Sequence, residues 1–381
     1  MKYYIIAGEA SGDLHASRLI RAIRLNDSQA DFRAWGGDLM QKEGATIVKH
    51  YRDLAFMGFA EVISNLPTIL GNMRFCKSDL LQYQPDLVIF VDYPGFNIPI
   101  AKFSKGKGFK TAYYISPQVW AWKENRVKTL RKVVDKMMVI LPFEKDFYQR
   151  WNYPVDYVGH PLIEIIEDYK KNNDPAATRN NLQIKGDKKI IALLPGSRKQ
   201  EILKKLPIML EAATRFPEHV FVVGQAPGIA DEMIAQFTDA FENIKVLKGD
   251  TYGLLSIADA ALVTSGTATL ETALFGVPEV VCYLGSPISY AIAKRIIKIK
   301  YISLVNLIMD KKVVEELIQQ DLTADKIAVA LAKIISDSVA INQIREDYLQ
   351  LNQLLQAGGR ASEKAASIID AMVKEKARTT F

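Results

Sequence analysis

The 381-residue sequence has few residues of the kinds that form disulfides or hold zinc. Its only cysteines, Cys76 and Cys282, are far apart in the chain, which argues against a disulfide framework and against a thiolate metal site. None of its four histidines stands four residues from another, so the helical histidine pair of a zinc hydrolase is missing.

Long apolar runs are also missing. No stretch approaches the ~18 apolar residues of a transmembrane helix. The apolar run at 2–7 is too short for the core of a signal peptide and lacks a cleavage pattern. We therefore expect a cytoplasmic protein, with binding to a membrane surface left open.

No strong excess of one charge sign is present. The net charge of +6 admits an anionic partner without identifying one. A nucleic-acid reader presents a dense basic and aromatic surface, whereas the basic residues of this chain are interspersed with acidic ones. No nucleic-acid partner is expected.

Short apolar runs alternate with helical patterns through the first half of the chain. The runs at 3–7, 87–91, 111–115 and 136–141 predict strands of a parallel sheet that is buried on both faces. A polar stretch with the breaker Asp174-Pro175 then predicts a linker with a helical entry.

A second series of strands follows, at 190–194, 219–223, 260–264 and 280–283, and the chain is helical from 323. Two such series predict an α/β protein with two Rossmann-like domains, an interdomain cleft and a helical C-terminal segment. The expected domains are an N-terminal one at 1–165, completed by C-terminal helices at 345–381, and a C-terminal one at 185–340.

In such sheets, ligands bind beyond the carboxyl ends of the strands. The loop at 8–13 has this position, and its glycines allow a ligand to approach the backbone at the start of a helix. Ser11, Gly12 and Asp13 are therefore candidate ligand contacts, with a plain tight turn as the alternative.

The loop at 195–198 has the same position in the second series. Gly196 permits close approach, Ser197 is a candidate helix cap, and Arg198 has the forked guanidinium that binds phosphate. The alternative is a capped helix with a solvated arginine.

The loop after the strand at 260–264 is the third candidate. Ser265, Gly266 and Thr267 offer amides and hydroxyls, and Glu271 is one turn further on, where a carboxylate accepts hydrogen bonds from ribose. A Ser/Thr cap on an ordinary helix is the alternative. Two such loops in one domain favour a nucleotide diphosphate, although no lysine follows a GxxxxG pattern, so this is not a P-loop.

Asp92 is the candidate for chemistry. It directly follows the strand at 87–91, at the carboxyl end that we expect to face the cleft. An aspartate that caps the following turn is the alternative.

Together these segments resemble the lipid-A-disaccharide synthases, sugar-nucleotide glycosyltransferases of the two-Rossmann-domain type called GT-B. The matching segments occur in the family's order: Gly8-Glu9-Ala10-Ser11-Gly12-Asp13, Pro117-Gln118-Val119-Trp120-Ala121-Trp122, Gly159-His160-Pro161-Leu162, Leu194-Pro195-Gly196-Ser197-Arg198, Ser265-Gly266-Thr267-Ala268-Thr269-Leu270-Glu271 and Tyr301-Ile302-Ser303-Leu304-Val305-Asn306-Leu307.

The resemblance implies a definite reaction. The donor is UDP-2,3-diacylglucosamine, the acceptor is 2,3-diacylglucosamine 1-phosphate (lipid X), and the products are a β-1,6-linked disaccharide 1-phosphate and UDP. The anomeric centre inverts, and no metal or cofactor is expected. The lipid substrates imply peripheral association with the inner face of the cytoplasmic membrane. The resemblance also allows a homodimer, of which the sequence itself gives no sign.

The resemblance also implies roles for the candidates. Asp92 is the base that takes the proton of the acceptor hydroxyl, a role typically worth ~10²–10⁴-fold in rate. Arg198 and the amides at 265–267 stabilise the charge on the departing UDP.

The resemblance implies roles for four further residues. Glu271 holds the ribose, and Asn306 orients the sugar or the phosphates. Gln118 and Trp120 line the cleft, although neighbouring tryptophans more often serve packing.

An apolar stripe at helical spacing has two interpretations. On periodicity alone it belongs to a core. With acylated substrates, an exposed stripe that meets acyl chains or the bilayer is the alternative. Its residues are Phe59, Val62, Ile63, Leu66, Ile69 and Leu70.

Two other functions remain open from the sequence. One is another UDP-sugar enzyme of the GT-B type, either an N-acetylglucosaminyltransferase or an epimerase. The other is a non-catalytic nucleotide-sugar binder.

Overall fold

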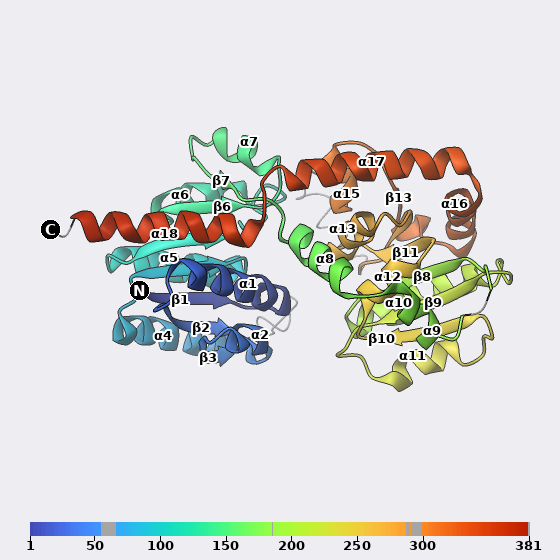
Figure 1. Cartoon of the computed structure of the whole chain (residues 1–381), viewed down its shortest axis with the longest axis horizontal. Helices are drawn as coiled ribbons and strands as arrows, with labels where there is room; N and C mark the ends of the chain where they lie inside the picture. The colour runs from blue at the N-terminus through green and yellow to red at the C-terminus, as the bar shows by residue number, and fades with distance from the viewer. Residues whose placement is uncertain (55–65, 185, 287–289, 291–298, 380–381) are drawn as a thin grey trace. The chain divides into compact units, whose positions relative to one another are not determined.

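The computed structural model describes residues 1–54, 66–184, 186–286, 290 and 299–379, and it contains two compact units. The N-terminal unit comprises Met1–Pro161 and Leu355–Phe381, and the C-terminal unit comprises Leu162–Leu354. Each unit has a parallel sheet of its own flanked by helices (Figure 1). The predicted α/β class with two Rossmann-like units and a helical C-terminal segment is confirmed.

The sheet of the N-terminal unit has the strand order β3-β2-β1-β4-β5-β6-β7. Its strands are β1 (Lys2–Ala7), β2 (Asp31–Gly36), β3 (Thr46–His50), β4 (Leu87–Val91), β5 (Lys110–Tyr114), β6 (Lys136–Val139) and β7 (Asp156–Tyr157). Side chains alternate between the two faces of the sheet, so Tyr3 and Ile5 enter one core while Tyr4 and Ile6 enter the other.

Helices cover both faces of this sheet. Their bounds are α1 (Ala10–Asn26), α2 (Asp38–Lys42), α4 (Leu66–Tyr83), α5 (Pro94–Gly106), α6 (Val127–Val133), α7 (Glu144–Gln149) and α18 (Ala361–Thr379), with short 3-10 turns at Tyr51–Asp53 and Glu124–Arg126. The last helix, α18, comes from the far end of the chain and packs beside α1 (Figure 1). The returning chain passes close at a glycine pair, because a Cβ on Gly358 would lie 2.1 Å from the nitrogen of Gly159.

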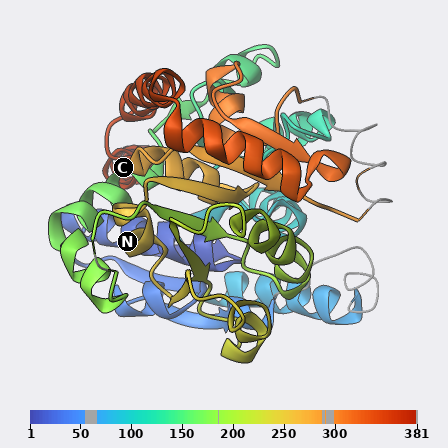
Figure 2. The same ribbon diagram turned by 90° about the vertical axis from the view of Figure 1, so that its right-hand side faces the viewer.

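The sheet of the C-terminal unit has the order β10-β9-β8-β11-β12-β13. Its strands are β8 (Ile190–Leu194), β9 (Val220–Gln225), β10 (Ile244–Lys248), β11 (Ala260–Thr264), β12 (Glu279–Tyr283) and β13 (Glu315–Ile318). Its helices are α8 (Pro161–Asn172), α9 (Pro175–Asn181), α10 (Lys199–Ala213), α11 (Asp231–Thr238), α12 (Thr251–Ile257), α13 (Thr267–Phe275), α15 (Leu304–Met309), α16 (Ala324–Ser336) and α17 (Ser338–Gln356), and the turn Gln319–Asp321 is 3-10. Figure 2 shows the strands of this unit layered between its helices.

The stretch predicted as a linker with a helical entry holds two helices, α8 and α9. Asp174 caps the second of them, since its carboxylate accepts a hydrogen bond from the Ala176 amide at 2.9 Å and Pro175 occupies the first turn of α9. The C-terminal unit therefore begins at Leu162 rather than at 185. It also keeps α17 as far as Leu354, which the sequence prediction had placed from 345 on with the N-terminal domain.

The sheet orders put two pairs of loops at switch points. In each sheet the chain winds outward in one direction and then in the other, with the reversal between β1 and β4 and between β8 and β11. The loops that follow these four strands therefore diverge at the carboxyl edge, where ligands of such sheets bind. Asp92 follows β4, and the two predicted nucleotide loops follow β8 and β11.

Candidate active site

Asp92 has a backbone conformation that few residues adopt. Its φ of 43° is left-handed, as are those of Tyr93 at 48° and Ile115 at 64°. The Asp92 amide donates to the Ile115 carbonyl at 3.2 Å, and the Asn97 side-chain amide donates to the Asp92 carbonyl at 2.7 Å. The Tyr113 hydroxyl donates to the same carbonyl oxygen. These contacts hold a strained turn in one geometry, which is typical of functional sites.

The surroundings of the Asp92 carboxyl suit a general base. Burial, with a smaller contribution from the nearby Glu9 carboxylate, raises the pKa of Asp92 to about 6, against an ordinary value of 3.8. The Tyr93 amide, which hydrogen-bonds the carboxylate, opposes this rise. A carboxylate of this pKa is ionised at neutral pH and is a better proton acceptor than an exposed aspartate.

The loop predicted at 8–13 is shorter than expected, because α1 begins at Ala10. Gly8 is required here, since a Cβ would lie 2.4 Å from the Tyr93 ring. Ser11 is exposed in the first turn of α1. Gly12 is buried and packs the helix against β1, with Ala7 3.1 Å from the site of a Cβ.

Asp13 has a structural role instead of a ligand-binding one. Its buried carboxylate accepts hydrogen bonds from the amides of Gly37 (2.8 Å), Leu39 (3.1 Å) and Met40 (3.1 Å), at the start of α2. A carboxylate at a helix start both accepts the free amides and complements the helix dipole. These three bonds tie the carboxylate to the start of α2, which contradicts the predicted contact of Asp13 with a ligand.

The segment after β5 contains both an exposed residue and a residue that packs against the rest of the unit. Gln118 is exposed, whereas Trp120 is half-buried and packs edge-on against Phe143, with ring centroids 5.0 Å apart. Beside Trp120 lies the buried Glu144, whose carboxylate accepts from the amides of Ile140 and Leu141 at 3.1 and 2.9 Å. Burial raises the pKa of Glu144 to about 7, and the hydrogen bonds from the amides of Leu141 and Ile140 oppose the rise. Trp120 therefore anchors the segment, and Gln118 is its solvent-facing member.

The C-terminal unit has a cavity of about 380 Å³ at the carboxyl edge of β8 and β11. It brings together the two loops that the sequence predicted, including Ser197, Arg198, Ser265, Gly266, Thr267 and Glu271. The sequence analysis missed its other walls, which are formed by Gly224 and Ala226 at the end of β9 and Thr251 at the start of α12. A Cβ on Gly224 would lie 2.6 Å from Leu194, so this glycine keeps the cavity floor open.

Two helices begin at this cavity without a side-chain cap. Arg198 is the N-cap of α10 and Gly266 that of α13, and neither start has a capping side-chain hydrogen bond among the described residues. The predicted cap by Ser197 is therefore wrong, since the helix begins one residue later. The Ser265 hydroxyl donates instead to the Ile302 carbonyl at 3.1 Å. Amides at such helix starts and the positive end of the dipole favour an anion such as a diphosphate.

Arg198 and Glu271 lie on the wall of the cavity. The Arg198 guanidinium donates to Glu201 at 3.0 Å while most of its side chain is exposed. The Glu271 carboxylate accepts a hydrogen bond from the Tyr252 hydroxyl at 2.7 Å. Burial raises the pKa of Glu271, and this hydrogen bond opposes the rise. One carboxylate oxygen has Tyr252 as its donor, and the group as a whole lines the cavity, where ribose hydroxyls are suitable donors.

Asn306 does not reach the cavity. It is fully buried, its amide group donates to Val314 and Glu316, each at 2.9 Å, and its oxygen accepts from the amides of Val313 and Val314. All of its hydrogen-bonding capacity is used within the fold. The prediction that Asn306 orients the sugar or phosphates is therefore replaced by a structural role.

The apolar stripe is only partly described, because Phe59, Val62 and Ile63 lie outside the described residues. On α4, Leu66 is 50% and Leu70 44% exposed, and Phe75 further along is 47% exposed. Ile69 is partly buried. For the described part of the stripe, the interpretation as pure core is therefore wrong.

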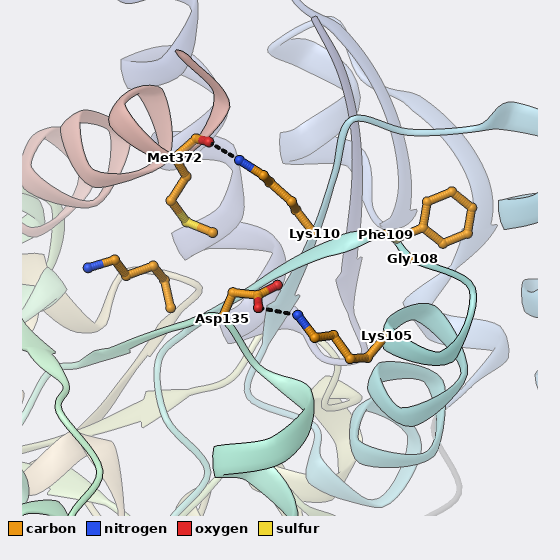
Figure 3. A pocket seen from close by; sticks show the side chains of 7 residues that line it. Lys105, Gly108, Phe109, Lys110, Asp135 and Met372 are labelled. Carbon is orange, nitrogen blue, oxygen red and sulfur yellow. Dashed lines mark hydrogen bonds and ion pairs between the residues drawn. The ribbon is translucent and has the colours of Figure 1, made fainter. Parts of the chain in front are cut away.

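A second cavity, of about 340 Å³, lies at the other edge of the N-terminal sheet (Figure 3). It is lined by Lys110 and Lys136, which begin β5 and β6, and so lies at the strand ends opposite to Asp92. Its lysines have partners, as the dashed lines of Figure 3 show for Lys105 with Asp135 and for Lys110 with the Met372 carbonyl.

The residues that the structure describes contain no group of three or more His, Cys, Asp or Glu side chains suited to hold a metal ion. No single described helix is long and apolar enough to cross a membrane. The helical segments Ala324–Ser336 and Ser338–Lys374, bent by 83° relative to each other, are together long and apolar enough by length and composition only.

Comparisons with known proteins extend these observations. Residues 3–371 match the sequence family described as lipid-A-disaccharide synthetase. The chain is 37% identical to the lipid-A-disaccharide synthase of Trichlorobacter lovleyi, with 97% of each chain covered. It is 36% identical to that of Geobacter sulfurreducens, with 96% of this chain and 95% of the relative covered.

Solved structures share the fold at low sequence identity. A UDP-GlcNAc 2-epimerase from Neisseria meningitidis, bound to UDP-GlcNAc, has a TM-score of 0.66 at 12% identity, covering 98% of this chain and 100% of its own. The kitacinnamycin glycosyltransferase has a TM-score of 0.65 at 13% identity, covering 98% and 99%. These structures are similar to the chain in fold.

Proposed function

The chain belongs to the lipid-A-disaccharide synthetase family and is a disaccharide-forming glycosyltransferase of GT-B fold that uses a nucleotide sugar and a lipid, and we propose its substrates in detail. The donor is UDP-2,3-diacylglucosamine and the acceptor is 2,3-diacylglucosamine 1-phosphate. The products are the β-1,6-linked disaccharide 1-phosphate and UDP.

The acceptor hydroxyl loses its proton to Asp92. As the C6 oxygen of the acceptor bonds to the anomeric carbon of the donor, the bond from that carbon to UDP breaks and its electron pair leaves with UDP. One base on the face opposite the leaving group is sufficient for inversion, through an oxocarbenium-like transition state. The observation that carries this role is the carboxylate at the end of β4 with its pKa raised to about 6.

The cavity at β8 and β11 binds UDP. The diphosphate takes the amides at the uncapped starts of α10 and α13 and the guanidinium of Arg198, with Ser197, Ser265 and Thr267 beside it. These fixed donors stabilise the charge that develops on the leaving group. Glu271 accepts hydrogen bonds from the ribose.

In this proposal the N-terminal unit binds the acceptor and contacts the bilayer. Ser11, Gln118 and Trp120 contribute to the acceptor side, and the exposed Leu66 and Leu70 contact acyl chains. Phe59, Val62 and Ile63 extend the same stripe in sequence. The protein then works at the inner face of the cytoplasmic membrane, and we include a homodimer in the proposal.

The test is incubation of the purified protein with the acylated UDP donor and lipid X, followed by mass spectrometry. A tetraacyl disaccharide 1-phosphate is expected with both substrates and with neither alone. Parallel incubation with UDP-GlcNAc, followed by sugar analysis, separates the epimerase alternative. Epimerised sugar without disaccharide would overturn the proposal. Sedimentation velocity in detergent measures the oligomeric state.

A further inference from the structure

An exposed tryptophan with two cations on its ring follows β5. Trp122 is 43% exposed. The Nζ of Lys123 lies 4.2 Å and the Cζ of Arg126 5.5 Å from centroids of the Trp122 ring system. Cations at these distances are attracted to the ring face, so the indole holds both side chains in place. We call Trp122, Lys123 and Arg126 the cationic cluster.

The two cations of the cluster have no carboxylate partner in the part of the chain that the structure describes. Glu124 stands between them in sequence and is paired with neither. The lysines of the cavity in Figure 3 differ, since Lys105 is paired with Asp135 and Lys136 with Asp156. The positive charge of the cluster is therefore available to an anion.

The cluster and the proposed base follow neighbouring strands of one sheet, and the Asp92 amide donates to the carbonyl of Ile115, which directly follows β5, at 3.2 Å. Burial and the nearby Asp92 raise the pKa of Tyr113, while the Asn97 side chain and the Arg126 charge lower it. Arg126 is thus within electrostatic range of Tyr113, whose hydroxyl donates to the Asp92 carbonyl. The strands that carry these groups are neighbours, with Val91 of β4 paired to Tyr114 of β5.

We propose that Lys123 and Arg126 bind the phosphate monoester of the acceptor sugar next to Asp92. A guanidinium binds two phosphate oxygens at once, and an ammonium adds a compact charge. The C6 hydroxyl and the C1 phosphate of a hexose flank the ring oxygen. A base at one and cations at the other therefore suit a single sugar. This inference rests on the proposed function and makes the phosphate the feature by which the acceptor is selected.

The experiment compares two acceptors, lipid X and the same diacylglucosamine without phosphate. Arg126→Gln and Lys123→Gln are each expected to raise the KM for lipid X by roughly tenfold, as for the loss of a charged hydrogen bond. The KM for the donor stays unchanged. With the dephosphorylated acceptor, parent and variants have the same KM. Lys136→Gln at the opposite sheet edge removes an equal charge and is expected to change neither KM.

Several outcomes overturn the inference. One is an equal loss with both acceptors, and another is a KM for lipid X that stays at the parent value. A third is lost binding to phosphatidylglycerol vesicles with acceptor selection intact, because the cluster would then recognise lipid head groups instead.

Calorimetry with glucosamine 1-phosphate separates this inference from the proposed function. The parent protein is expected to bind this probe more tightly than Arg126→Gln does. If disaccharide forms but the probe binds both proteins alike, the inference alone fails. If the probe distinguishes them but no disaccharide forms, the proposed function fails.

Discussion

The side-chain amide of Asn97 donates a hydrogen bond of 2.7 Å to the main-chain carbonyl of Asp92 and thereby fixes the residue that we propose as the base. The same amide is 3.3 Å from the carbonyls of Ile6 and Val91. Asn97 is fully buried on α5. One side chain thus connects the ends of β1 and β4 at the switch point of the sheet.

Replacing Asn97 tests this positioning role. Asn97→Ala leaves buried carbonyls without a donor, so we expect it to lower stability by about 1–3 kcal/mol. It is also expected to lower kcat while changing the KM for the donor less, because the Asp92 turn loses a hydrogen bond that holds its conformation. Urea unfolding and steady-state kinetics measure both. Tyr113→Phe, which removes only the hydroxyl, is the milder companion, and an unchanged kcat in both variants would contradict the role.

The proposed base has a pH signature. With a pKa of about 6, Asp92 is protonated and inactive at low pH, so kcat/KM is expected to rise with pH up to about 6 and then level. Glu9→Gln removes a neighbouring charge that raises this pKa, and the rise then moves to lower pH. Asp92→Asn is expected to lower transfer by ~10²–10⁴-fold with UDP affinity kept. Transfer within a few-fold of the parent would exclude Asp92 as the base.

The same pKa predicts an effect on stability. Since the folded-state pKa of Asp92 lies above its ordinary value of 3.8, the folded protein binds the proton more tightly than the unfolded chain does. Stability therefore falls as pH rises from about 4 to 6, and the cost stays above pH 6. Asp92→Asn carries no charge at this position. Its Tm is expected to exceed that of the parent at pH 8 but not at pH 4, and the opposite order would contradict the assignment.

The UDP cavity predicts a pair of binding effects. Arg198→Ala removes a charged donor and Glu271→Ala removes the proposed acceptor of the ribose hydroxyls. Each is expected to weaken UDP binding by roughly tenfold in calorimetry. Tyr252→Phe serves as control, because it removes only the bond to Glu271 and is expected to have a smaller effect. Unchanged affinity in the Arg198 variant would remove this side chain from the phosphate site.

The structural role of Asp13 is tested against Ser11. Asp13→Ala leaves three amides at the start of α2 without their acceptor and is expected to cost about 1–3 kcal/mol in urea unfolding. The folded fraction is expected to keep its KM for the acceptor. Ser11→Ala, at an exposed position, is expected to leave stability unchanged. Intact stability with a raised acceptor KM in the Asp13 variant would return Asp13 to the site.

The exposed end of α4 predicts a membrane effect. Leu66→Ser with Leu70→Ser is expected to reduce sedimentation with liposomes and to leave Tm nearly unchanged, because both side chains are already about half exposed. Leu25→Ser, at an exposed leucine on α1, is the matched control. Equal liposome binding by all three proteins would remove α4 from the membrane contact.

The sequence by itself determined the buried strands and the loops after them. The strands β4, β8 and β11 have the predicted bounds, because a strand covered on both faces is a continuous apolar run with polar neighbours. Asp92, Arg198 and Glu271 could be proposed for the same reason, since each follows such a run at a defined offset.

Only the tertiary structure decided the rest. Strands at the sheet edges, such as β10 and β13, include charged residues that are not fully buried and give no continuous apolar run. The roles of Asp13 and Asn306 depend on amides at other positions in the sequence. The exposure of Leu66 depends on what packs against α4. Sequence spacing places a side chain on an element, but burial and hydrogen-bond partners are set by what packs against that element.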